Sequence, residues 1–126
     1  MSKRAMSVNK VPAVGPYSQA VEAGGFVFCS GQIPLDPQTG SLAGPDIGKA
    51  TRQVMANLAA VLGEAGLAMK DVVKTTIYLM NLDDFAVVNE IYGSFFDGEY
   101  PARATVQVAG LPRGAHIEID AVAVRP

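Results

Sequence analysis

Arg103 stands in the string EYPARATVQV, between Pro101-Ala102 and a segment with the alternating pattern of a β-strand. Charged residues are sparse, at 17% of the chain, and this guanidinium lies where the pattern turns apolar. A guanidinium is a planar fork of N–H donors that can hold a carboxylate or phosphate by two parallel hydrogen bonds. We interpret Arg103 as a candidate anchor for a small carboxylate. The alternative is a structural arginine whose stem covers apolar surface and whose head meets water or a neighbouring acid.

Glu118 is the second candidate, in the string HIEIDAVAV. Strand alternation places His116, Glu118 and Asp120 on one face of the segment. That face becomes apolar at Val122 and Val124, so we expect partial desolvation to raise the pKa of the Glu118 carboxyl toward values useful for proton transfer. If this end of the strand lies in water, Glu118 is an ordinary surface carboxylate.

Three other places carry polar or small residues in unexpected positions. Asn89 interrupts an apolar helical stripe, so its amide either braces a loop or faces a wet pocket. Ser30-Gly31 follows a strand, and the missing β-carbon of Gly31 either lets a ligand approach the backbone or simply marks a loop entry. Tyr17 follows Gly15-Pro16 in a rigid loop, where its ring either packs or closes over a small ligand.

Metal and cofactor chemistry are not expected. One His and one Cys cannot supply a zinc or iron site of the usual kind. Asp83-Asp84 has the character of a helix start rather than of a magnesium site. The sequence contains no GxGxxG, Walker A or GxSxG string. Cys29 lies in an apolar segment, where a thiol resists ionisation, which disfavours a role as nucleophile.

The bulk composition predicts one domain spanning residues 1–126, with a hydrophobic core that needs no disulfide. The net charge of −2 and the pI of about 5.2 argue against nucleic acid or a membrane surface as the main partner. No apolar run approaches the roughly 18 residues of a membrane span. The single cysteine fits a reducing compartment, so we expect a cytoplasmic protein. Many apolar and few charged residues also suggest that other subunits cover part of the surface.

The sequence pattern of the first half of the chain predicts a hairpin, a loop and a helix. Residues 18–23 and 26–30 flank Gly24-Gly25, which can supply the positive φ values of a two-residue turn. Residues 34–45 are rich in turn formers and predict a loop. Asp46 is predicted to cap a helix over residues 47–65 that stops at Gly66.

The second half predicts a strand, a second helix and a closing hairpin. Residues 71–79 alternate and are rich in β-branched side chains, as in a strand. A helix then begins near Asn81 and ends before Gly98 and Pro101. Its expected buried stripe is Leu82, Phe85, Asn89, Tyr92 and Phe96.

Residues 104–108 and 116–124 are predicted to pair as a hairpin, and a short extra strand is expected near residues 5–8. This order predicts an α+β fold, one mixed sheet with two helices packed on one face. We expect a partner to cover the other face.

Together these strings resemble the RidA (YjgF) family of enamine/imine deaminases. The resemblance runs from GPYSQAV through FVFCSGQIPLDPQTG, DVVKTTIYL, VNEIYGSFF and PARATVQV to IEIDAVAV. It implies a chorismate-mutase-like fold and a homotrimeric barrel with active sites in the clefts between subunits. It also implies hydrolysis of 2-iminopropanoate and 2-iminobutanoate to 2-oxo acids and ammonia, which removes reactive metabolites.

Carried over residue by residue, the resemblance implies that Arg103 binds the substrate carboxylate and that Glu118 handles water and the departing ammonia. Tyr17, Ser30, Gly31 and Asn89 would line the pocket. Thr105 is a departure, since many relatives carry Cys at this position. A backbone carbonyl there can orient water whichever side chain is present, so we expect the activity to survive.

Two other functions stay open at this stage. A non-catalytic binding module would use the same cleft to hold a small metabolite carboxylate, because related proteins can keep a fold and change the task. Such a module needs an anchor like Arg103 but has no need of Glu118. A ribonuclease or translation inhibitor is disfavoured by the acidic pI and the lack of a basic stripe.

Overall fold

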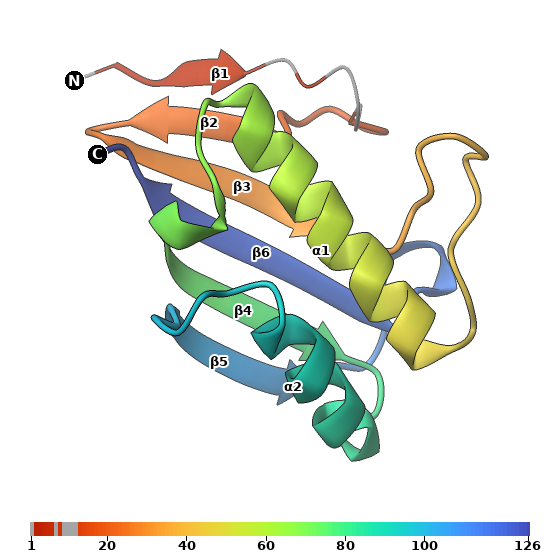
Figure 1. Cartoon of the computed structure of the whole chain (residues 1–126). Helices are drawn as coiled ribbons and strands as arrows, with labels where there is room; N and C mark the ends of the chain where they lie inside the picture. The colour runs from red at the N-terminus through yellow and green to blue at the C-terminus, as the bar shows by residue number, and fades with distance from the viewer. Residues whose placement is uncertain (1, 7, 9–12) are drawn as a thin grey trace.

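A single mixed sheet carries both helices on one of its faces (Figure 1). The computed structural model describes residues 2–6, 8 and 13–126. Within these residues the strands are β1 (Arg4–Met6), β2 (Ala20–Ala23), β3 (Phe26–Gln32), β4 (Val72–Leu79), β5 (Ala102–Gln107) and β6 (Ile117–Val124), and the helices are α1 (Ile47–Glu64) and α2 (Phe85–Gly93). The strand order is β1-β2-β3-β6-β4-β5. The predicted α+β class, with two helices on one face, is confirmed.

Local signals in the first half of the chain are confirmed. Gly24 and Gly25 have φ values of 61° and 83°, as a tight turn between right-handed twisted strands requires. The side chain of Asp46 accepts a hydrogen bond from the backbone N–H of Lys49 and so caps α1. At the other end the chain turns at Gly66, which has a φ of 75°.

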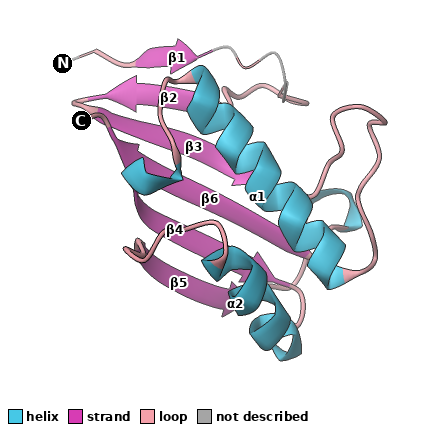
Figure 2. Cartoon of the chain, viewed as in Figure 1, coloured by secondary structure: helices cyan, strands magenta, loops and turns pink. Residues whose placement is uncertain are grey.

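The predicted closing hairpin is wrong. β6 lies between β3 and β4 and is antiparallel to both, as Figure 2 shows. β5 lies at the edge of the sheet, parallel to β4, with Lys74 opposite Ala102 and Leu79 opposite Gln107. The reason is that α2 connects β4 to β5 as a crossover, and a crossover of this kind places the second strand parallel to the first.

Strand ends also differ from the prediction. β5 begins two residues earlier than expected, so Arg103 lies inside the strand. The extra N-terminal strand is β1, which ends at Met6, and residue 7 of the predicted segment lies outside the described residues. Ser30 and Gly31 lie within β3, at an irregularity in its pairing with β6 between Cys29 and Gln32.

The second helix is shorter than predicted and its buried stripe differs. A 3-10 turn over Leu82–Asp84 precedes α2, and α2 ends at Gly93 instead of continuing toward Gly98. Its buried residues are Val88, Ile91 and Tyr92, whereas Leu82 and Phe85 are 43% and 40% exposed. Because α2 lies over the β4–β5 edge of the sheet, Phe85 and Asn89 face Arg103 there rather than the core.

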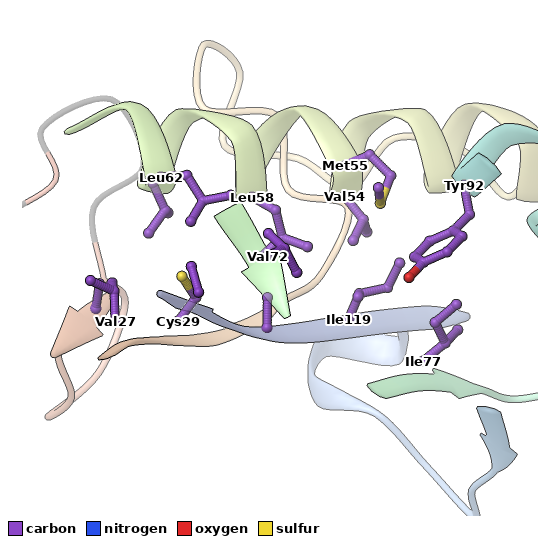
Figure 3. Packing of buried hydrophobic residues seen from close by; sticks show 14 of the residues in the cluster. Val27, Cys29, Val54, Met55, Leu58, Leu62, Val72, Ile77, Tyr92 and Ile119 are labelled. Atoms are coloured by element: carbon purple, nitrogen blue, oxygen red, sulfur yellow. The ribbon is translucent and has the colours of Figure 1, made fainter. Parts of the chain in front are cut away.

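The hydrophobic core lies between the helices and the sheet (Figure 3). α1 contributes Val54, Met55, Leu58 and Leu62, all of them fully buried. Burial also raises the pKa of the Cys29 thiol to about 11, with a smaller contribution from the charge of Asp120. No helix among the described residues has the length and hydropathy to cross a membrane.

The helix-free face of the sheet carries large apolar side chains in the open. Phe26 and Phe28 of β3 are 43% and 47% exposed, and Val73 of β4 and Val106 of β5 are exposed as well. Glu118 and Asp120 lie on the same face, because Ile117 and Ile119 point into the core.

Candidate active site

The candidate residues lie around two hollows. Arg103 belongs to the first, on the helix-covered side of β5. It pairs in register with Thr75, whose hydroxyl lies 2.7 Å from the Tyr92 hydroxyl of α2. The guanidinium donates a hydrogen bond from Nη1 to Oδ1 of Asn89, at 2.7 Å. This hollow, of about 330 Å³, is lined by Asn89, Tyr92, Gly93, Tyr100, Pro101 and Arg103.

The neighbours of Arg103 hold it without neutralising it. Its Cζ lies 5.4 Å from the ring centre of Phe85 and 5.2 Å from that of Tyr92, where the rings attract a cation. Neither of the two ion pairs found in the described part of the chain involves Arg103. The hydrogen bond to Asn89 uses one of its donors, so the others are available to an anion that arrives from outside.

Thr105 lies on the same side of β5 as Arg103, because the two residues are two apart along the strand. Its Oγ1 is buried and finds no hydrogen-bond partner among the described residues. Buried hydroxyls are normally hydrogen-bonded. The hydroxyl is therefore a group that water or a ligand near Arg103 could satisfy.

Glu118 lies on the opposite face, where β6 places it in register with Tyr78. Its side chain is half-buried, and this burial raises the pKa of its carboxyl. The negative charge of Asp120 raises the pKa further. The Tyr78 hydroxyl donates to Oδ2 of Asp120 at 3.0 Å. The expected upward shift of the Glu118 pKa is thus confirmed.

The Glu118 carboxylate occupies the space that a side chain at residue 31 would fill. A Cβ built on Gly31 would clash with the carboxylate, with Cδ of Glu118 only 2.8 Å away. The neighbouring Ser30 donates from Oγ to the backbone oxygen of Ser18 at 2.6 Å. This bond ties the irregular part of β3 to the chain before β2.

A cavity of about 540 Å³ opens beside Glu118. Its lining includes three of the other predicted residues, Tyr17, Ser30 and Gly31, together with Val14, Gln19, Gln32, Ile33, Leu35, Pro112 and Arg113. Of these lining residues, Tyr17 is 46% exposed. Asn57 of α1 supports the wall, because its Nδ2 donates to the backbone oxygens of Ile33 and Leu35 at 3.2 and 2.8 Å.

Two of these residues were missed by the sequence reasoning. Asn57 interrupts the buried side of α1, which is the same signal that identified Asn89. Arg113 lies in the Leu-Pro-Arg-Gly segment that connects the two strands of the predicted hairpin. Its position beside a glycine in a turn gives no sign that the side chain borders a cavity.

The structure divides the predicted residues into two groups. Tyr17, Ser30 and Gly31 gather with Glu118, whereas Asn89 and Thr105 lie on the side of Arg103. Arg103 and Glu118 point to opposite faces of the sheet. A single chain therefore does not bring its candidate anchor and its candidate proton carrier together.

The fold is a two-layer α+β domain with an arginine of open donors on the helix-covered face of its sheet and a half-buried carboxylate on the other face. Residues 8–125 match the model of the family described as Endoribonuclease L-PSP. The chain belongs to this family, and the resemblance to RidA proteins is confirmed.

Named relatives match nearly end to end. The chain is 53% identical to "Protein DfrA" of Myxococcus xanthus, over 98% of this chain and 97% of the relative. It is 46% identical to the 2-iminobutanoate/2-iminopropanoate deaminase of Salmonella typhimurium, over 99% of each. Among solved structures, E. coli TdcF with bound serine superposes with a TM-score of 0.92 at 42% identity, covering 98% of this chain and 99% of that one.

Proposed function

We propose that this chain is an enamine/imine deaminase that hydrolyses 2-iminopropanoate and 2-iminobutanoate to 2-oxo acids and ammonia. The observation that carries the proposal is that one chain presents both an arginine whose donors are open, Arg103, and a half-buried glutamate of raised pKa, Glu118, on opposite faces of its sheet. The name of the Salmonella relative, at 46% identity over 99% of the chain, supports the substrate class.

The reaction needs only a few catalytic groups from the protein. A protonated imine is already electrophilic, so the enzyme has to place a water molecule and move protons. Arg103 holds the substrate carboxylate. The Glu118 carboxylate takes a proton from water as the oxygen bonds to C2, and then returns it to the nitrogen of the tetrahedral intermediate. The C–N bond breaks as the C=O bond forms, the hydroxyl proton of the intermediate passes back to the Glu118 carboxylate, and ammonia leaves. The reaction requires neither a metal nor a covalent nucleophile.

The site is completed between subunits of a homotrimer. Arg103 of one subunit and Glu118 of the next would face the same cleft, which accounts for their placement on opposite faces of one chain. The exposed Phe26 and Phe28 support this assembly, because a neighbouring subunit would cover them. We place the protein in the cytoplasm, where enamines released by pyridoxal-phosphate dehydratases would supply the substrate.

The alternative function is a binding module for a small carboxylate. The two functions are distinguished by whether the protein hydrolyses the imine. The test is to generate 2-aminoacrylate in situ with a serine dehydratase and to follow 2-oxo acid and ammonia with and without this protein. We expect faster release with the parent protein and loss of the acceleration in Glu118→Gln. Binding of pyruvate without any acceleration by the parent would favour the binding module and contradict the proposal.

A further inference from the structure

Arg113 occupies a backbone conformation that suits glycine. It lies in the 3-10 turn Pro112–Gly114 with φ 58° and ψ 23°, and it is the one non-glycine residue with positive φ in the described ranges 2–6, 8 and 13–126. A side chain in this left-handed region strains the backbone, whereas glycine adopts it freely. Strain of this kind is concentrated at functional sites. The strain therefore suggests that the arginine side chain has a function at this position that glycine could not supply.

Arg113 lines the cavity beside Glu118, and its guanidinium is weakly bonded. The cavity that it lines also includes Ser30 and Gly31. Its one hydrogen bond within the described residues runs from Nη2 to the backbone oxygen of Gly40, at 3.3 Å. Neither ion pair of the described chain includes it, unlike Arg4 and Arg125, which both bind Glu22. Most of its donors are thus free to bind an anion in the cavity.

The cavity is larger than a three-carbon substrate needs. Its volume of about 540 Å³ falls in the range of sites for much larger ligands, ~300–1,000 Å³. In the reaction proposed above, Arg103 holds the carboxylate next to the reacting carbon and Glu118 lies beside that carbon. Arg113 has no part in that chemistry. A cation on the cavity wall can bind a second acidic group on the substrate and offset its repulsion by Glu118.

We infer that Arg113 is a specificity-determining residue that binds the distal carboxylate of 2-imino dicarboxylic acids, so that the enzyme accepts substrates such as 2-iminosuccinate. This inference rests on the proposed deaminase function. The distal carboxylate would take two parallel hydrogen bonds from the guanidinium fork, while the rest of the substrate binds as 2-iminopropanoate does.

The test compares kcat/KM for 2-iminosuccinate and 2-iminopropanoate, which amino-acid oxidases generate in situ from aspartate and alanine. The main variant is Arg113→Asn, because asparagine tolerates the left-handed region and carries no charge. Arg113→Gly is a second neutral variant that relieves the strain. Arg113→Lys keeps the charge, and Arg52→Gln removes an exposed arginine of α1 that lines no cavity described above.

We expect the ratio of kcat/KM for the dicarboxylate to that for the monocarboxylate to fall about tenfold in Arg113→Asn and Arg113→Gly. It should fall less in Arg113→Lys and stay at the parent value in Arg52→Gln. The inference about Arg113 would be overturned by an unchanged ratio in both neutral variants. It would also be overturned by a parent enzyme that turns over 2-iminopropanoate but not 2-iminosuccinate. Either result would leave the proposed deaminase function in place. A parent protein that turns over neither imine would instead remove the proposed function.

Discussion

Arg103 is positioned by contacts that leave its charge unneutralised. Asn89 accepts one of its hydrogen bonds, and the rings of Phe85 and Tyr92 flank the guanidinium. A purely structural arginine would more often end on a carboxylate, as Arg125 does on Glu22. The surroundings of Arg103 therefore favour binding of an external anion.

Replacing Arg103 with lysine tests the two-bond anchor. Lysine keeps the charge but loses the planar fork, so only a bidentate role predicts a large effect. A hydrogen bond to a charged group contributes about 1.5–3 kcal/mol, which corresponds to about one to two decades in kcat/KM for 2-iminopropanoate. Arg52→Lys, on the exposed side of α1, is the matched control. A value for Arg103→Lys within about threefold of the parent would rule out the anchor.

The pH dependence tests the role of Glu118. As a base, Glu118 works in its ionised form, so kcat/KM should fall as the pH drops through its raised pKa. Asp120→Asn removes a negative charge that disfavours ionisation of Glu118, and this lowers the Glu118 pKa. The acidic limb of the profile should therefore move to lower pH. Tyr78→Phe leaves both carboxylates in place and should not move it. Superimposable acidic limbs for the parent and Asp120→Asn would contradict this assignment.

At the scale of elements, the sequence predicted turns and helix caps well but predicted less well which strands pair in the sheet. The Gly24-Gly25 turn and the Asp46 cap depend on neighbouring residues, and both are confirmed. The position of β6 between β3 and β4 depends on contacts between distant segments, which local patterns do not encode. The apolar stripe of α2 was misread because the helix lies at a sheet edge, where aromatic side chains also pack beside Arg103.

The same limit applies to the candidate site. Strand alternation was enough to predict that Glu118 is partly desolvated, because its neighbours in sequence decide its face. The partners of Arg103 and the cavity wall at Arg113 depend on which elements meet in space. Residue spacing could therefore nominate candidates, but it could not show that Arg103 and Glu118 lie on opposite faces.

Asn57 connects α1 to the cavity wall, and its removal should affect both stability and substrate binding. Asn57→Ala leaves the carbonyls of Ile33 and Leu35 without their partner inside the protein, which should cost about 1–3 kcal/mol of unfolding free energy. The loosened wall should also raise KM. Urea denaturation and steady-state kinetics measure the two effects.

The matched control for Asn57 is Gln53→Ala. Gln53 donates to Oδ1 of Asn57 at 2.9 Å, so its loss leaves both bonds to the cavity wall intact. A loss of stability as large in Gln53→Ala as in Asn57→Ala would show that the wall bonds are not the source.

At the scale of the whole molecule, the helix-free face of the sheet predicts assembly. We expect light scattering to give three times the 13.2 kDa mass of one chain. Phe28→Asp places a charge in the middle of the expected interface and should shift the mass toward the monomer and reduce activity. Val87→Asp, at a similarly exposed position on α2, should leave the trimer intact. A monomeric parent protein at micromolar concentration would contradict the assembly.

Mixed trimers test most directly whether the deaminase site joins Arg103 of one subunit to Glu118 of the next. Alone, Arg103→Lys is expected to keep about a tenth or less of the parent's activity, and Glu118→Gln is expected to lose the acceleration. When the two are co-expressed, every mixed trimer keeps one cleft with both native residues, so random assembly should restore about a quarter of the parent's rate of 2-iminopropanoate hydrolysis. Activity of the mixed trimers no higher than the average of the two variants would contradict the account.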